Sequence, residues 1–198
     1  MHHRVLFAPL AVLCLLVFCS VPLANAQCVE GTITSEMQMF GPFAGLYKYT
    51  VEVEWTTPFG LSHLTLDCGF SMCPEAACSR IWVFEEEAGT GVGGEPDGCE
   101  FGFRGEFNCN GDPSIGVTDP VVKWDAEDNG CEGGKTGSAV LCFFTDIAPI
   151  QSDVPVSLIK DGQDVCEGSL SGDCPMACPV PVESTGWGRL KLLLGRER

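Results

Sequence analysis

Cysteine is the residue type in this chain whose number and spacing are most informative about possible chemistry. The sequence holds thirteen cysteines but three histidines, and two of these, His2 and His3, stand at the extreme N-terminus. Such cysteine density in an exported chain predicts disulfides, and the shortage of histidine argues against most metal and acid–base chemistry. The disulfide candidates are the eleven cysteines after residue 27: Cys28, Cys68, Cys73, Cys78, Cys99, Cys109, Cys131, Cys142, Cys166, Cys174 and Cys178.

The spacing of these cysteines bears on two alternatives to simple pairing. A structural zinc site favours ligand gaps of two to four residues, and only Cys174 and Cys178 approach that pattern. The odd number leaves one cysteine over. Either Cys142, inside an apolar run, is a buried free thiol, or it pairs and a loop cysteine such as Cys131 stays free or bonds another chain. A cysteine nucleophile is not expected, because His63 is the only histidine that could serve it as a base.

The connectivity of the cysteines cannot be read from the sequence. Pairing between neighbours along the chain is nevertheless plausible, and it predicts two bridges: Cys99 with Cys109, and Cys166 with Cys174.

Other polar residues offer weaker candidates for a site. Ser62 and His63 are neighbours and would face opposite sides of a strand, so they predict no hydrolase triad, and we expect His63 to hydrogen-bond within a sheet or to a loop. The run Asp125–Gly130 resembles part of a calcium loop, with Asp125, Glu127 and Asn129 as candidate ligands. Thr136 stands where the loop's bidentate glutamate belongs, so an ordinary acidic turn is the competing interpretation.

Two further candidates concern sugars: paired carboxylates could cleave them, and a platform of aromatic side chains could bind them by stacking. The many acids allow a glycosidase pair facing across a cleft, although a sequence cannot show that arrangement. We expect Trp55, Trp82 and Trp124 to lie in the core, together with Phe101, Phe103, Phe143 and Phe144. An inhibitor-like factor would need a protruding loop closed by cysteines, and Glu85–Glu100 is the candidate for it.

The elements that must position these residues are strands. Residues 46–55 alternate Tyr47, Tyr49, Val51, Val53 and Trp55 with polar residues, which predicts a half-buried strand. Residues 61–67 resume the pattern after a break and suggest a hairpin with it. Six shorter runs follow: 81–84, 101–107, 121–124, 139–145, 154–160 and 165–170. Turn-forming stretches, among them Gly89–Gly94, separate them, and helical periodicity is limited to one turn near Glu75–Cys78. The expected fold is all-β, an antiparallel β-sandwich stapled by disulfides.

The two ends of the chain differ from its body. A basic start, an apolar run and small residues at Ala24 and Ala26 predict a signal peptide over 1–26, and the run is too short for a membrane span. A single sandwich domain is then expected over 27–174, followed by a Pro-rich spacer and a basic tail over 175–198. Residues 27–186 hold 26 acidic and six basic residues. That charge argues against nucleic acid as a partner of the body.

Two stretches resemble known secreted proteins. The strand Tyr47–Trp55 with Leu61-Ser62-His63 and Cys68, followed by Val122-Lys123-Trp124-Asp125 and later Gly172-Asp173-Cys174-Pro175, is similar to secreted, mostly bacterial β-sandwich modules of extracellular and surface proteins. The chain departs from their pattern at Val121, where glycine is usual. The resemblance implies a fold and a compartment and carries no catalytic residues. The tail 183–191 resembles short Trp-Gly ends of exported Gram-negative proteins, which implies sorting or anchoring through Trp187, Arg189 and Lys191; a frayed amphipathic end is the alternative.

These observations predict a secreted or cell-surface module without enzymatic activity, serving structure, adhesion or ligand binding. Its partner would be an extracellular protein or a glycan, and no cofactor is expected apart from the calcium candidate. The alternatives are a carbohydrate-active hydrolase that uses paired carboxylates and a disulfide-rich inhibitor-like factor.

Overall fold

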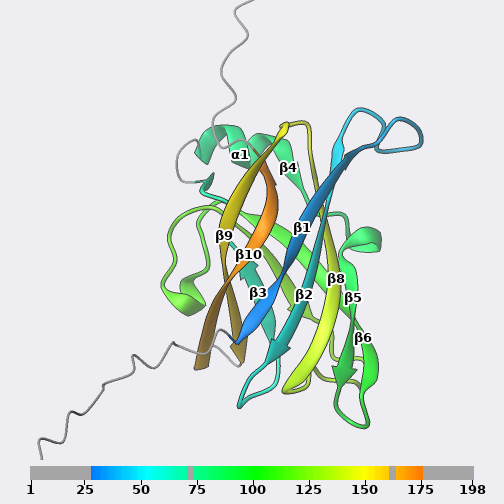
Figure 1. The fold of residues 1–198 in the computed structure, drawn as a ribbon, viewed down its shortest axis with the longest axis vertical. Helices are drawn as coiled ribbons and strands as arrows, with labels where there is room; N and C mark the ends of the chain where they lie inside the picture. The colour runs from blue at the N-terminus through cyan, green and yellow to red at the C-terminus, as the bar shows by residue number, and fades with distance from the viewer. Residues whose placement is uncertain (1–27, 71–73, 161–163, 176–198) are drawn as a thin grey trace, which may run out of the picture.

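The computed structural model describes residues 28–70, 74–160 and 164–175 (Figure 1), and for residues 152–160 and 164 it describes the backbone alone. It confirms an all-β fold, with one short helix at the predicted turn. The strands are β1 (Val29–Met37), β2 (Tyr47–Thr56), β3 (His63–Leu66), β4 (Ile81–Trp82), β5 (Gly89–Gly94), β6 (Cys99–Asn108), β7 (Val121–Ala126), β8 (Thr136–Thr145), β9 (Pro149–Lys160) and β10 (Asp164–Pro175). The helices are α1 (Pro74–Arg80) and two 3₁₀ turns, η2 (Glu85–Glu87) and η3 (Pro113–Ile115).

The strands form one continuous sheet that curls until its ends meet. Its order is β2-β1-β10-β9-β3-β7-β6-β5-β8-β4, and β8 also pairs with β2, which closes the ring. The sandwich of two separate sheets is therefore not confirmed. The expectation of antiparallel pairing fails at one seam, because β1 and β10 run parallel. This seam joins strands from opposite ends of the described chain, so a parallel pairing requires no local crossover.

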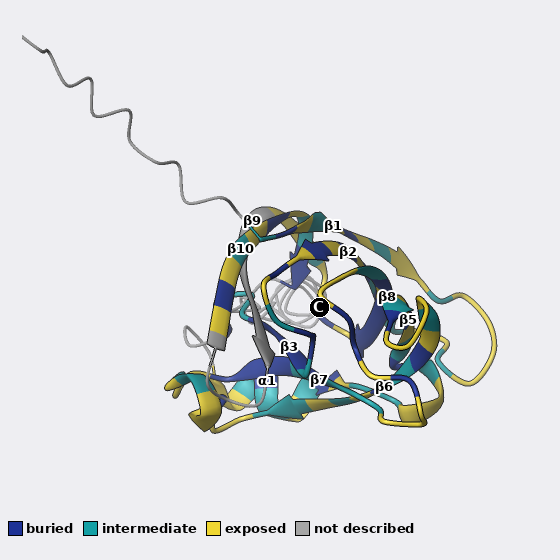
Figure 2. Cartoon of the chain, turned by 90° about the horizontal axis from the view of Figure 1, so that it is seen from below, coloured by how far each residue is buried: buried dark blue, intermediate teal, exposed yellow. Residues whose placement is uncertain are grey.

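The buried apolar residues of the strands form one core cluster inside the curled sheet. Figure 2 shows the curled sheet end-on, with the positions of buried residues in dark blue. The alternation predicted along β2 is confirmed, since Tyr49, Val51, Val53 and Trp55 are buried while Glu52 and Glu54 are exposed. The buried polar tips find partners within the fold. Trp55 Nε1 donates to the Gly134 carbonyl at 3.0 Å, and Tyr49 Oη donates to the Ile147 carbonyl at 3.2 Å. Because their polar atoms make these hydrogen bonds, Trp55 and Tyr49 can be buried without the free-energy cost of an unpaired polar group.

One predicted core residue lies elsewhere. Trp124, Phe101, Phe103, Phe143 and Phe144 are buried as expected, but Trp82 is 37% exposed. The strand β4 has only two residues and pairs with the end of β8, so the outer side of Trp82 has no neighbouring strand to cover it.

The pairing of strands differs from the sequence expectation in two places. The predicted hairpin of residues 46–55 with 61–67 is wrong: β2 lies between β1 and β8, and β3 lies between β7 and β9. The stretch Gly89–Gly94 is a strand rather than a turn, so the proposed loop Glu85–Glu100 is largely built into the sheet. Its glycines suit close packing, because a Cβ on Gly91 would lie 2.8 Å from Phe101 Cζ.

Four disulfides cross the described fold, and none follows the predicted pairing of chain neighbours. Cys28 bonds Cys166, Cys68 bonds Cys174, Cys78 bonds Cys109, and Cys99 bonds Cys131. Their Cα atoms lie 5.6–6.1 Å apart, the separation that a disulfide requires. The predicted pairs Cys99–Cys109 and Cys166–Cys174 are wrong. The members of each pair stand on one extended strand or at its end, and the eight or ten residues from one to the other hold their side chains more than about 25 Å apart. Cys73 and Cys178 lie outside the described residues.

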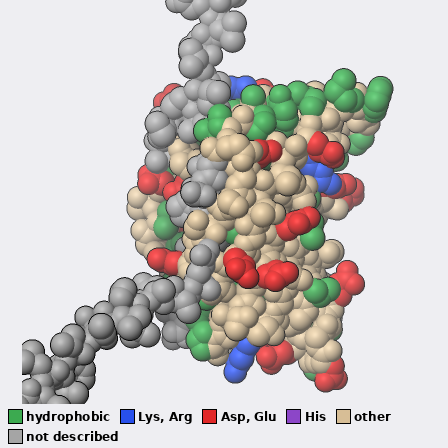
Figure 3. Space-filling model, viewed as in Figure 1, with side chains coloured by type: hydrophobic (Ala, Val, Ile, Leu, Met, Phe, Trp, Pro, Cys, Tyr) green, Lys and Arg blue, Asp and Glu red, His purple; other side chains and the backbone are tan. Residues whose placement is uncertain are grey.

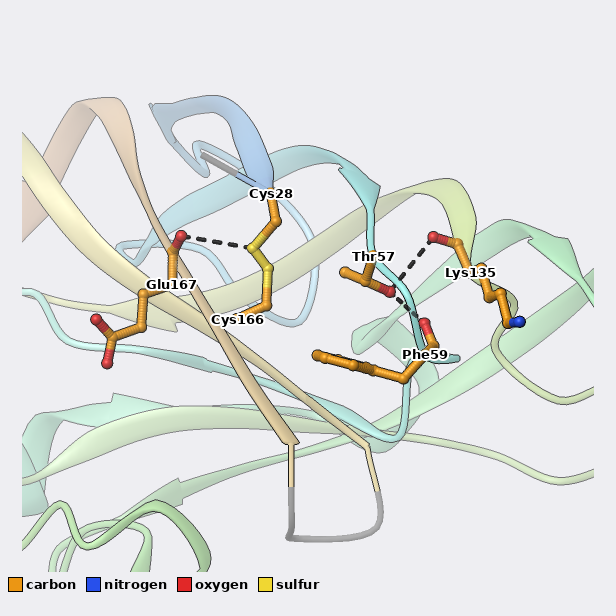
Figure 4. The surroundings of a disulfide bond; sticks show 6 residues. All are labelled: Cys28, Thr57, Phe59, Lys135, Cys166 and Glu167. Carbon is orange, nitrogen blue, oxygen red and sulfur yellow. Dashed lines mark hydrogen bonds between the residues drawn. A yellow bond between two sulfur atoms is a disulfide. The ribbon is translucent and has the colours of Figure 1, made fainter. Parts of the chain in front are cut away.

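The disulfide Cys28–Cys166 closes one end of the parallel seam (Figure 4). The ladder between β1 and β10 is short, with Thr32 opposite Ser171 and Ile33 opposite Gly172. At the other end, the Asp173 carboxylate accepts hydrogen bonds from the backbone amide of Ser35 at 2.9 Å and its hydroxyl at 2.6 Å. The Cys28 sulfur also lies 3.5 Å from the Glu167 carbonyl oxygen, a contact without a proton to share, since the sulfur is in a disulfide. A covalent bond and a carboxylate thus support a seam that has few ladder bonds.

Among the described cysteines, Cys142 is the one outside a disulfide, as in one of the two alternatives that the sequence left open. It is buried and unbonded, whereas Cys131 is in a disulfide. Burial raises the pKa of the Cys142 thiol, with Lys48 opposing this through its positive charge. A shielded, neutral thiol of this kind behaves as a small apolar side chain.

Candidate functional site

A buried polar cluster surrounds the single histidine of the described chain. His63 and Thr65 stand on the same face of β3, and Asp112 reaches them from the loop that leads into η3. The Asp112 carboxylate accepts from Thr65 Oγ1 at 2.7 Å and lies 3.1 Å from His63 Nε2. Its second oxygen accepts from the hydroxyl of Ser114 at 2.5 Å and from the Ser114 backbone amide at 3.1 Å. Asp112 is 1% exposed, and its carboxylate binds the loop to the sheet.

The pKa shifts in this cluster follow from burial and from its hydrogen bonds. Burial alone would raise the pKa of Asp112, but hydrogen bonds from Ser114 and Thr65, with the charges of His63 and Lys123, lower it below its usual value. Burial lowers the pKa of His63, and the positive charge of Lys123 lowers it further. The negative charges of Asp112 and Asp125 raise this pKa, but the net shift is downward. At neutral pH the cluster therefore holds an ionised Asp112 beside a neutral imidazole.

The cluster contains a serine, a histidine and an aspartate but not the geometry of a hydrolase triad. In a triad the histidine bonds the serine through one ring nitrogen and the aspartate through the other. Here the same atom, His63 Nε2, lies 3.3 Å from Ser114 Oγ and 3.1 Å from Asp112 Oδ2. The Ser114 hydroxyl donates its hydrogen bond to Asp112 Oδ1 and not to His63. The arrangement caps η3 and does not activate a nucleophile, in line with the expectation that His63 bonds to a loop.

The sequence did not predict Asp112, Thr65 and Ser114 as partners of His63. A signal did exist for the loop itself. Asp112-Pro113-x-x-Gly116 places an N-cap acid, a first-turn proline and a terminal glycine around a short helical turn. The sequence does not predict that this turn packs over β3.

The calcium candidates lie at the end of β7. Asp125 pairs with Lys123 Nζ at 3.2 Å and stands opposite Arg104 on β6. Asp128 accepts from the backbone amide of Gly130 at 3.2 Å, a turn of the kind expected for an acidic loop. Among residues 28–70, 74–160 and 164–175, no group of three or more Asp, Glu, His or Cys is placed to hold a metal ion. Calcium binding by Asp125, Glu127 and Asn129 stays a prediction.

A groove of about 750 Å³ lies on the outer face of the sheet. Figure 3 shows the acidic side chains on the face that carries β1 and β2. We call this feature the acidic groove. Its lining comes from five strands that lie side by side, β10, β1, β2, β8 and β5: Glu30, Gly31, Thr32, Glu52, Val53, Glu54, Thr90, Val92, Ser138, Ala139, Val140 and Ser169.

The acidic groove combines uncompensated charge with exposed apolar side chains. Glu30 lies directly opposite Glu54 across the β1–β2 ladder, and like charges in that position repel one another. The described lining contains no lysine or arginine. On the β5–β8 side, Val92 and Val140 are 49% and 48% exposed. They are diagonal neighbours, since Val92 pairs with Ser138 and Thr90 with Val140. A complementary ligand would therefore be cationic on one side and apolar on the other.

The remaining predicted site residues cannot be compared with the geometry. The described residues do not include Trp187, Arg189 and Lys191, the predicted signal peptide over 1–26 or residues 176–198. In the part of the chain that the structure describes, no helix is both long and apolar enough to span a membrane. No family model, curated protein or solved structure matches the chain.

Proposed function

We propose that this protein is a secreted, non-enzymatic binding module of the extracellular space or cell surface, and that the acidic groove is its binding site. Four disulfides support an oxidising compartment. The observation that carries the proposal is the groove's pairing of three exposed glutamates with two exposed valines. Ligands that fit this surface are basic peptide segments with branched apolar side chains.

The same proposal includes a single domain over residues 27–174. It is supported by one continuous cluster of buried residues that draws on strands from both ends of the described chain, from Val29 in β1 to Leu170 in β10. We further propose that opposite sides of the curled sheet pack against each other like the two layers of a sandwich. Limited proteolysis that leaves one stable fragment close to these limits would support the single domain.

A defined peptide tests the groove. The probe is a fluorescent nonapeptide of alternating lysine and leucine, and its counterpart carries glutamate in place of lysine. We expect the lysine peptide to bind the full chain and the glutamate peptide not to bind. The double variant E52Q/E54Q should weaken binding of the lysine peptide by about tenfold, the equivalent of 1.4 kcal/mol.

A matched control separates local recognition from net charge. Glu85 and Glu86 are exposed in η2 and are not among the residues that line the groove. The variant E85Q/E86Q removes the same two charges and should bind the lysine peptide as the unmodified chain does. Equal weakening by both double variants would mean that the whole acidic surface attracts the peptide, and would contradict a specific groove.

The hydrolase alternative depends on the carboxylate pair Glu30 and Glu54, which face each other across two strands. Both side chains are exposed to water, whereas a catalytic acid is held protonated by shielding. Turnover of chromogenic glycosides that is lost in E30Q and E54Q would favour this alternative over binding. For the carbohydrate-binding version of the module, a glycan array without hits would exclude it.

A further inference from the structure

The acidic groove has a candidate occupant within the chain itself. We propose that the basic C-terminal segment, residues 186–198, binds in the acidic groove of the same molecule and competes with external ligands. The inference depends on the proposed function, since it takes the groove to be a binding site. It adds a regulatory role for a segment whose sequence predicts either sorting or anchoring, or a frayed amphipathic end.

Charge and side-chain type match between the two surfaces. The segment carries four bases, Arg189, Lys191, Arg196 and Arg198, against the single acid Glu197. It also carries the leucines Leu190, Leu192, Leu193 and Leu194. The groove presents glutamates along β1 and β2 and valines along β5 and β8. Basic groups can thus face the glutamates while leucines cover the exposed valines, which is the complementarity that gives an interface its specificity.

The segment can reach the groove. The last described residue, Pro175, ends β10, and Ser169 of the same strand lines the groove six residues earlier. Six strand residues span about 20 Å. Ten residues, 176–185, separate Pro175 from Gly186, and such a length of chain extends to at most about 40 Å. The chain can therefore turn back along the outer face without any rearrangement of the sheet.

Covalent attachment makes weak binding sufficient. A segment on a short tether faces its site at an effective concentration in the millimolar range. With a dissociation constant of about 0.1 mM, an effective concentration of about 1 mM would fill about nine-tenths of the grooves. An external ligand would then bind with an apparent affinity about tenfold below its intrinsic one.

The test uses the full chain, with residues through Arg198 verified by intact mass. The comparison is with R189Q/K191Q/R196Q/R198Q, which keeps the length of the tail and removes its positive charge. We expect the lysine–leucine peptide to bind this variant about tenfold more tightly than the unmodified chain. Zero-length carbodiimide coupling, read by mass spectrometry, should join Lys191 to Glu30, Glu52 or Glu54 within monomers.

The outcomes separate this inference from the proposed function. Equal peptide affinity in both chains, with Lys191 uncoupled from the groove, would overturn tail docking while the groove stays a binding site. Absence of peptide binding in both chains, together with groove coupling of Lys191, would support docking and contradict the external ligand. Coupling found only in dimers, or only to acids outside the groove such as Glu85 and Glu86, would overturn intramolecular docking.

Discussion

The buried cluster at His63 and the acidic groove use carboxylates in opposite ways. Asp112 is almost fully buried, and each of its oxygens accepts hydrogen bonds from Thr65, His63 or Ser114. Glu30 and Glu54 are exposed, lie opposite one another and have no basic residue in the described groove lining. A carboxylate whose hydrogen bonds are all made within the fold stabilises the structure, whereas a carboxylate exposed to solvent stays available to a partner. Whether a carboxylate is buried and hydrogen-bonded therefore indicates its role better than its residue type does.

Removal of the buried carboxylate should have the largest effect. We expect Asp112→Ala to lower the free energy of unfolding by about 3 kcal/mol, because Thr65 and Ser114 lose their acceptor and His63 its partner. Urea denaturation followed by tryptophan fluorescence measures the loss. The exposed Asp119→Ala is the control and should change stability by less than about 0.5 kcal/mol. A similar loss in both variants would contradict a special role for Asp112.

Acid should weaken the cluster in two steps. Because the pKa of His63 is lowered in the fold, the unfolded chain takes up a proton first, so stability falls as the pH drops below the ordinary value of about 6.5. The lowered pKa of Asp112 gives stability that is present above its ordinary value of 3.8 and is lost as the pH falls through the lower folded value. Urea midpoints from pH 8 to pH 3 should show both declines.

His63→Gln isolates the first of these steps. Glutamine retains a donor for Asp112 but does not titrate, so the decline between pH 7 and pH 5 should become shallower. An unchanged slope in this variant would assign the acid sensitivity to groups other than His63.

Neutralisation of one groove glutamate should have a smaller and opposite effect. Glu54→Gln removes a cross-strand repulsion with Glu30 and should raise stability by about 0.3 kcal/mol, a value limited by solvent screening. The same change should reduce binding of the lysine–leucine peptide. Thermal unfolding and fluorescence titration measure the two effects, with Glu86→Gln as control. A loss of stability in Glu54→Gln would mean that this carboxylate serves structure, as Asp112 does.

Calcium should have the smallest effect. A bound ion at one hundred times its dissociation constant would add about 2.7 kcal/mol to stability and raise the melting temperature by several degrees. We expect no shift between calcium and chelator, because Asp125 already pairs with Lys123 and stands opposite Arg104. A rise of several degrees would establish the site at Asp125, Glu127 and Asn129.

Local pattern was a good guide to elements with strong alternation and a poor one to the rest. The strand β2 was predictable because aromatic and β-branched residues alternate along it. The strand β1 was missed, since only Val29 and Ile33 are buried along its nine residues. The strand β5 was missed because its glycines signal turns, although here they admit the rings of Phe101 and Phe103. Each missed strand owes its place to its neighbours rather than to its own composition.

The sequence by itself determined the all-β class, the inward face of β2 and the prediction of a disulfide framework. These depend on residue type and on contacts between near neighbours, which a period of two and a cysteine count express. Only the tertiary structure decided the partners: Cys28 with Cys166, the isolation of Cys142, Asp112 over His63, and Glu30 opposite Glu54. Such pairs depend on the order of strands in the closed sheet, and many strand orders satisfy the same alternation, so a single sequence does not select among them.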